Sequence, residues 1–145
     1  MAFQFSLAAV LKYRESLEHR AYLTLERTHQ EVARTEAQIL QVDDWRRTAA
    51  EQRAADLARG VTSIHLQGAY EYELALERYR DLLVGKLKEL KVRLQRELKL
   101  YETARQERRV LDELRSHKLE AYVRGQNRRE QHFLDELFLA RRKRD

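Results

Sequence analysis

Groups of side chains spaced so that they could together bind a metal ion are few in this sequence of 145 residues. Glu113 and His117 stand one helical turn apart, and His132 is followed closely by Asp135 and Glu136, so each group could supply metal ligands. No His-Glu-X-X-His motif joins them, and a histidine on a charged helix is far more often solvated than coordinated. The five histidines are His19, His29, His65, His117 and His132. We therefore expect no metal site and no cofactor.

Motifs for catalysis are missing as well. The sequence contains no G-X-X-X-X-G-K-[ST] loop that could hold the phosphates of ATP, and no recognisable nucleophile motif surrounds its serines or threonines. Cysteine is absent, which excludes disulfides and thiolate ligands. We predict that the chain is not an enzyme, has no catalytic residues and takes no small-molecule substrate.

The composition indicates that the chain forms a few long helices, which would position the side chains discussed above. Proline is absent, only 4 glycines occur, and Asn127 is the single asparagine. A sheet protein of this length would need many turns, and turns depend on these residue types. Strong helix formers dominate instead, and apolar or small residues recur at alternating steps of three and four. That spacing is typical of a coiled-coil seam.

One interruption separates the two apolar stripes. Gly60 can adopt the left-handed conformation that ends a helix. Thr62 can cap the next helix through its hydroxyl, with Ser63 as the competing cap. Val61 and Leu66 then have the spacing of a hydrophobic staple. The stretch predicts a reversal of the chain, the alternative being a harmless irregularity in one continuous helix.

The predicted fold is all-α, a long two-helix antiparallel coiled-coil hairpin in which helix two is longer than helix one. We expect a single coiled-coil domain over residues 1–145. Helix one is expected at about 6–58, the turn at 59–63 and helix two at about 63–142.

After about Leu119, helix two should extend past the amino terminus of the chain as an unpaired arm. Exposed apolar residues on such an arm indicate a docking surface. Phe3 and Phe5 could instead fold back and cover part of the arm, and both arrangements could hold together. The apolar residues of the arm are Tyr122, Val123, Phe133, Leu134, Leu137 and Phe138.

Charged side chains of both signs are interspersed, with a net charge of +5. Asp43 and Arg47 have the spacing of an ion pair along one helix. Basic clusters, such as the one from Arg141 to Arg144, could neutralise the phosphates of a nucleic acid. Acidic neighbours and the absence of a groove-reading motif favour an acidic protein surface instead. No apolar run of membrane-spanning length and no signal peptide are recognised, so we expect a cytoplasmic protein.

An aromatic patch on helix two has two interpretations. Tyr72 and Tyr79 lie seven residues apart and therefore share a helix face with Leu76 and Leu83. All four could form the seam near the turn, or part of the patch could face outward and bind a partner.

Three segments carry a family resemblance. The chain opens with Phe3-Gln4-Phe5-Ser6-Leu7, its turn reads Gly60-Val61-Thr62-Ser63, and Phe133-Leu134-Asp135-Glu136 is followed by Arg141-Arg142. In this order, and over essentially the whole chain, they resemble the FliJ family of flagellar type III export proteins.

The resemblance implies a non-catalytic role in protein export. Members of this family are cytoplasmic coiled coils, shaped like the stalk of a rotary ATPase, at the inner-membrane base of the flagellar export apparatus. They bind the hexameric export ATPase, promote its assembly and activity, and contact the cytoplasmic domain of the export gate and export chaperones. Membrane contact is only indirect, through the apparatus. The alternatives are a stalk protein of a type III virulence secretion system and a basic coiled-coil protein associated with nucleic acid.

The resemblance also implies three partner-binding surfaces, carried over by position. The gate-binding patch would consist of Tyr72, Leu76, Tyr79 and Leu83. The chaperone-binding patch would consist of Gln38, Val42 and Trp45, where Trp45 stands at a position at which tyrosine is more familiar. The ATPase-facing surface would consist of Phe3, Phe5, Leu7, Val10, Leu11, Phe133, Leu134, Leu137, Phe138, Arg141 and Arg142.

Overall fold

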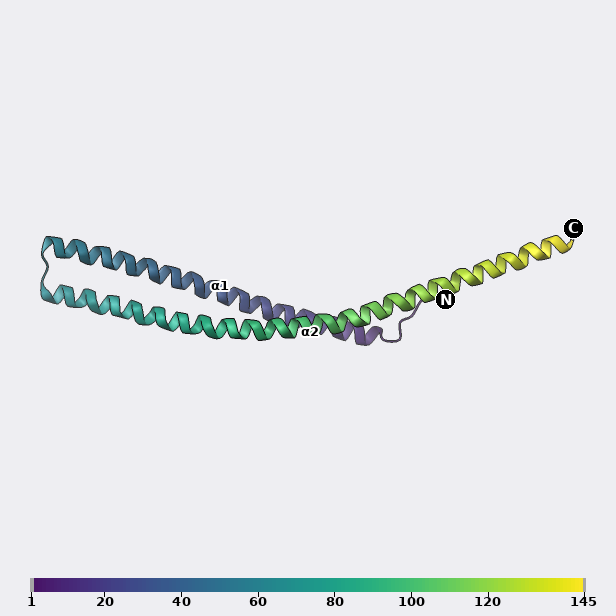
Figure 1. Ribbon diagram of the computed structural model, residues 1–145, viewed down its shortest axis with the longest axis horizontal. Coiled ribbons are helices and arrows are strands. Elements are labelled where there is room, and N and C mark those ends of the chain that lie inside the picture. Colours follow the sequence, from purple (N-terminus) through teal and green to yellow (C-terminus); the bar gives the residue numbers. More distant parts are fainter. Residues whose placement is uncertain (1, 145) are drawn as a thin grey trace. The chain divides into compact units, whose positions relative to one another are not determined.

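The computed structural model of the chain consists of two α-helices (Figure 1). α1 is Ala8–Arg59 and α2 is Ser63–Arg144. The structure describes residues 2–144, and it contains no β-strand in that range. The all-α fold with a longer second helix is therefore confirmed. The helix ends fall within two residues of the expected positions, because the caps and the glycine that set them are local signals.

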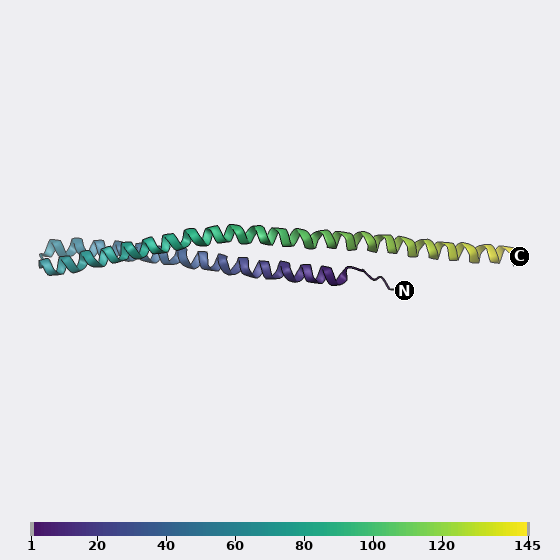
Figure 2. The same cartoon turned by 90° about the horizontal axis from the view of Figure 1, so that it is seen from below.

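By its contacts the chain divides into two compact units. We call Ala21–Leu100 the turn unit, and Met1–Arg20 with Tyr101–Asp145 the terminal unit. Within the turn unit the two helices lie side by side and antiparallel, which both views show (Figures 1 and 2). The single domain over residues 1–145 stays a prediction.

The turn itself follows from two residues, Gly60 and Thr62. Gly60 has a φ of +79°, a conformation that side-chain-bearing residues rarely adopt. Thr62 caps α2, since its Oγ1 accepts a hydrogen bond of 3.3 Å from the amide of His65. Both predictions for the turn are confirmed, and Ser63 is the first helical residue, not the cap.

The core of the turn unit is a narrow apolar seam. Val42, Leu76 and Leu83 form its buried cluster, against which Ile39 and Ala49 pack. Burying each of these larger side chains stabilises the pairing of the helices by roughly 1.5–3 kcal/mol. Leu25, Val32 and Leu90 are also buried along the seam.

Two threonines, Thr28 and Thr35, occupy fully buried seam positions in the same unit. Their hydroxyls donate to backbone carbonyls one turn earlier in α1, over 3.2 Å for Thr28 and 2.8 Å for Thr35. Because each hydroxyl is satisfied inside its own helix, the threonines can lie in the seam without an unpaired polar group.

Ion pairs between the helices flank the seam of the turn unit. Arg93 bonds Glu31 over 3.0 Å, and Arg53 pairs with Glu73 nearer the turn. The predicted pair of Asp43 with Arg47 is wrong. Asp43 bonds Arg80 of α2, and Arg47 pairs with its neighbour Asp44. The error arises because spacing along one helix says nothing about a partner on the other.

The terminal unit is held by ionic and aromatic contacts. Arg108 of α2 bonds Glu18 of α1, with its Nε 2.6 Å from Glu18 Oε2. Ahead of α1, the ring of Phe3 lies 5.6 Å from that of Tyr122, and Phe5 is buried beneath the ammonium group of Lys118. Phe3 and Phe5 thus fold back onto α2, as one of the two interpretations expected.

Beyond these contacts α2 continues to Arg144, and every described residue from Asn127 onward is exposed. Phe3 contacts Tyr122, and the later apolar residues of the arm are uncovered, so the docking surface expected there stays a prediction. Within the described residues, neither helix contains a stretch apolar enough to span a bilayer.

Candidate partner-binding surfaces

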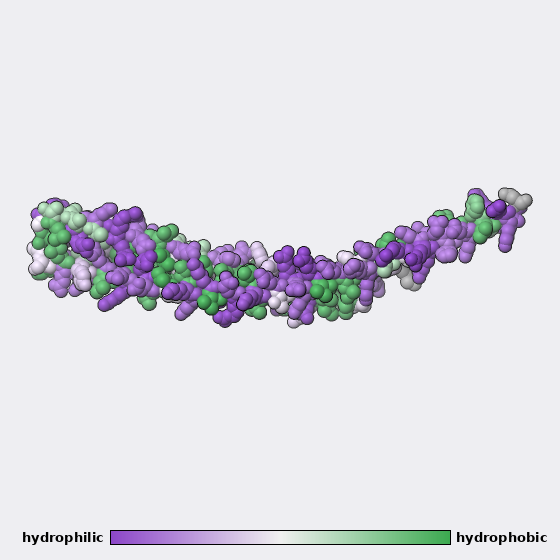
Figure 3. All heavy atoms as spheres, viewed as in Figure 1, coloured by the Kyte–Doolittle hydropathy of each residue, from purple (hydrophilic) through white to green (hydrophobic). Residues whose placement is uncertain are grey.

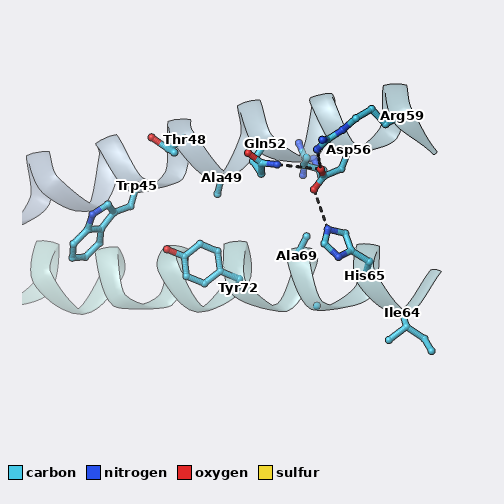
Figure 4. A pocket seen from close by; sticks show the side chains of 12 residues that line it. Trp45, Thr48, Ala49, Gln52, Asp56, Arg59, Ile64, His65, Ala69 and Tyr72 are labelled. Carbon is cyan, nitrogen blue, oxygen red and sulfur yellow. Dashed lines mark hydrogen bonds and ion pairs between the residues drawn. The ribbon is translucent and has the colours of Figure 1, made fainter. Parts of the chain in front are cut away.

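A groove with a volume of about 790 Å³ opens between α1 and α2 of the turn unit (Figure 4). We call it the turn groove. Trp45 and Tyr72 line one end of it, and Asp56 and His65 line the end near the turn. Ala49, Gly68 and Ala69 lie between the two ends. In the space-filling view, hydrophobic and hydrophilic residues alternate on the visible face of this unit (Figure 3).

The first end of the turn groove is aromatic. Trp45 projects from α1 toward α2, and Tyr72 projects from α2 toward α1 (Figure 4). Trp45 is 44% exposed and Tyr72 is 53% exposed. Half-exposed aromatic rings in a groove offer a large apolar contact area with a polar atom at the edge, as partner-binding sites often do.

The end near the turn is polar and tightly bonded. Asp56 is only 6% exposed, and its carboxylate accepts hydrogen bonds from Gln52 over 3.1 Å and from Arg59 over 2.5 Å. Its second oxygen lies 2.9 Å from Nε2 of His65, across the turn. We call these four residues the Asp56 clasp.

The bonds of the clasp change the acidity of Asp56. The hydrogen bond with His65 is the largest cause, and with Arg59 and Gln52 it lowers the pKa of Asp56 although burial acts in the opposite direction. The carboxylate is therefore held in its charged form and joins α1 to α2 beside the turn.

The arm of α2 carries the second candidate surface. Phe133, Leu134, Leu137 and Phe138 are each at least half exposed. Three of them line a shallow cleft of about 630 Å³ together with Arg141. Since residues four apart lie on the same side of a helix, these side chains form one apolar strip edged by a cation.

Among residues 2–144, no three histidine, cysteine, aspartate or glutamate side chains gather as metal ligands would. The family of the flagellar FliJ protein matches residues 3–144 of the chain. The chain belongs to the FliJ family. Searches of curated proteins and of solved structures gave no significant match.

Membership of the FliJ family makes the chain a component of the flagellar export apparatus. The resemblance seen in its sequence is confirmed over nearly the whole chain. Because the matching family is flagellar, the virulence secretion system is the less supported of the two export systems.

The gate-binding patch inferred from the FliJ resemblance does not form one exposed surface. Leu76 and Leu83 are buried in the core cluster, whereas Tyr72 and Tyr79 are about half exposed. The seam interpretation is therefore correct for the two leucines, whereas the two tyrosines face outward and their binding of a partner stays a prediction. Only the tyrosines can contact a partner while the hairpin stays closed.

The chaperone-binding patch inferred for this FliJ-family chain is divided in the same way. Val42 is the most buried apolar residue of the seam, Gln38 is half-buried, and Trp45 is half exposed in the turn groove. Val42 can therefore support the patch only from beneath, by holding α1 against α2.

The ATPase-facing surface inferred for the FliJ-family chain separates into a covered and an exposed part. At the amino-terminal end, Phe5 and Leu11 are buried, Phe3 and Leu7 are half-buried, and Val10 is exposed. All the inferred residues of the arm, including Arg141 and Arg142, are exposed.

The Asp56 clasp was not anticipated from the sequence of the FliJ-family chain. A signal for it exists, because Asp56 follows the seam residues Val42 and Ala49 at steps of seven. A carboxylate at a seam position beside a predicted turn needs a partner from across that turn, and His65 is close enough in sequence to supply it.

Proposed function

We propose that this FliJ-family chain is a non-catalytic cytoplasmic stalk, which binds the hexameric export ATPase and links it to the export gate and to export chaperones. It would work at the inner-membrane base of the flagellar export apparatus, reaching the membrane only through that apparatus. The observation that supports the proposal most is the arm of α2, whose apolar strip and basic end are exposed.

The arm has the chemistry of a segment that inserts between other subunits. A continuous α-helix is stiff, and its strip of Phe133, Leu134, Leu137 and Phe138 supplies aromatic and aliphatic anchors of the kind that dominate binding energy. The last turn holds only basic side chains, from Arg141 to Arg144. These cations favour an acidic lining in the partner, and they would speed and orient the encounter.

Such a stalk can raise the activity of an ATPase without taking part in the reaction. If the arm binds the assembled, hydrolysing ring more tightly than the separate subunits, binding shifts the population toward the ring. The effect is limited by the difference between the two affinities, so a contact made equally with both states would change nothing.

The gate and the chaperones would bind the turn unit. In this proposal Tyr72 and Tyr79 contact the gate, with Leu76 and Leu83 holding them in place from the core. Gln38 and Trp45 contact the chaperones, with Val42 beneath. The support is the half exposure of Trp45, Tyr72 and Tyr79, the first two of which line the turn groove.

The experiment that tests the proposal measures ATP hydrolysis and oligomeric state of the purified cognate export ATPase, with and without this protein. We expect a higher rate and a larger hexamer fraction when the protein is added. The protein alone should hydrolyse no ATP, which is the control for its own lack of catalysis. An unchanged rate together with an unchanged hexamer fraction would refute the proposal.

A further inference from the structure

The turn groove extends well beyond the two patches discussed above. From Trp45 to Arg59, α1 rises by about 20 Å at 1.5 Å per residue, so the groove edge is as long as four turns of helix. We infer that the turn groove binds an amphipathic α-helix of a partner protein, with an acidic residue of that helix facing Arg59 and His65. The inference rests on the proposed function and specifies the shape and charge of what binds the turn unit.

The floor of the groove lets another backbone come close. Ala49, Gly68 and Ala69 present small side chains or none, and a Cβ atom built at Gly68 meets no described atom within 4 Å. Trp45 and Tyr72 stand as walls at one end. Small residues between larger apolar ones are what a groove needs to accept the ridge of a third helix.

The charges that line the groove determine which charge on a bound helix is favourable. The carboxylate of Asp56 already accepts hydrogen bonds from Gln52, Arg59 and His65. It therefore has little remaining capacity to accept a hydrogen bond from a cation of the partner. The Arg59 side chain is 70% exposed, and the N–H groups of its guanidinium that do not face Asp56 can donate further hydrogen bonds, with the 56% exposed ring of His65 beside it. A carboxylate at the end of the bound helix complements these donors, whereas a basic residue there would be repelled.

Two substitutions at one position test the inference. Gly68→Glu sends a long anionic side chain into the groove, where it blocks the apolar floor and repels an acidic helix. Gly68→Ala adds one methyl group in open space and removes a helix-weakening glycine, so it controls for any change in fold. Leu82→Glu places the same charge at an exposed apolar site of α2 that does not line the groove.

Binding is measured by calorimetry with two purified probes, the cognate export chaperone and the cytoplasmic domain of the cognate export gate. For at least one probe we expect Gly68→Glu to weaken affinity by about tenfold or more, as for a central contact. Gly68→Ala and Leu82→Glu should change affinity by no more than about twofold, as for peripheral sites. Circular dichroism should show equal helicity in all three variants.

Each other outcome has a distinct meaning. If the wild type binds neither probe, the proposed gate and chaperone contacts fail, and the inference falls with them. If the wild type binds but Gly68→Glu binds equally well, the proposed function stands and the groove is overturned as the site. If the wild type self-associates and only Gly68→Glu prevents it, the occupant is a second copy of the chain, which also overturns the inference.

Discussion

Asp43 and Arg80 join the two helices of the turn unit through a two-point contact, with Arg80 Nε 2.6 Å from Asp43 Oδ1 and Nη2 3.5 Å from Oδ2. The hydrogen bond from Arg80 is the largest cause that lowers the pKa of Asp43, and the charges of Arg80 and Arg46 lower it further. Since both side chains are more than a third exposed, water and salt screen the pair, and its effect on stability is small.

Replacing Arg80 by glutamine should therefore raise the pKa of Asp43 toward its ordinary value. Carbon-detected NMR of the Asp43 carboxyl group during a pH titration measures this directly. Arg78→Gln, which changes an exposed arginine of the same helix, is the matched control and should leave the pKa of Asp43 where it is. An Asp43 pKa equal in wild type and Arg80→Gln would show that the ion pair does not form in solution.

The Asp56 clasp should make the stability of the hairpin depend on acid pH. The pKa of Asp56 is lower in the folded chain than in the unfolded chain, so the clasp stabilises fully above the unfolded pKa. This contribution is lost as the pH falls through the folded pKa. Asp56→Asn should lower the thermal midpoint at neutral pH, because an amide cannot replace the charge beside Arg59 and His65.

As the pH falls, the wild type loses its own carboxylate charge, and its midpoint should approach that of Asp56→Asn. Thermal unfolding followed by circular dichroism across the acid range gives both midpoints. Glu71→Gln, at an exposed position of α2, controls for the general effect of removing one negative charge. A difference between wild type and Asp56→Asn that stays constant with pH would contradict the ionic role of the clasp.

Because the gate-binding patch is partly buried and partly exposed, alanine should affect stability at Leu83 and gate binding at Tyr79. Leu83→Ala removes a buried side chain and should lower the free energy of unfolding by about 2 kcal/mol or more. Tyr79→Ala alters a half-exposed ring, so its effect on stability should stay below about 1 kcal/mol. Tyr79→Ala should instead weaken binding to the export-gate domain by about tenfold.

Urea unfolding and calorimetry with the gate domain separate these two effects. Measuring Leu83→Ala at a temperature where it remains folded keeps its binding result interpretable. Should Tyr79→Ala bind the gate domain like the wild type, the tyrosines do not carry the gate contact.

Alanine substitution should change the stability of the hairpin in opposite directions at two glycines, Gly60 and Gly85. Gly60 needs its positive φ to reverse the chain, and Gly60→Ala should destabilise the hairpin by about 1 kcal/mol or more. Gly85 lies in the interior of α2 with open space around it, so packing does not require it, and Gly85→Ala should stabilise by about 1 kcal/mol. Urea unfolding of both variants beside the wild type tests the pair, and stabilisation by Gly60→Ala would refute the turn geometry.

The turn could be predicted from the sequence because its signals are local. Gly60 and Thr62 act on the few backbone groups next to them, so no knowledge of the partner helix was needed. The seam was less predictable. Tyr72 and Leu76 are four residues apart on nearly the same face, and which of them is buried depends on how α2 is rotated against α1.

The ionic contacts between helices could not be read from spacing at all. Asp43 has an arginine four residues away, yet it bonds Arg80 because the register of the two helices brings that side chain closer. Register is set by the whole seam, including the buried Thr28 and Thr35, and no single residue or spacing reveals it.

The apolar strip of the arm of α2 is the feature on which the proposed binding of the ATPase depends most. Phe133→Ser with Leu137→Ser removes two neighbours from the apolar strip at exposed positions, so the helix should persist. Leu40→Ser with Leu82→Ser makes the same chemical change at two exposed sites of the turn unit and is the matched control.

The decisive experiment titrates each protein into the cognate export ATPase and measures the rate of ATP hydrolysis. We expect wild type and the Leu40/Leu82 variant to stimulate hydrolysis alike, whereas about ten times more of the Phe133/Leu137 variant should be needed for the same effect. Equal stimulation by all three proteins would contradict the arm as the part that binds the ATPase.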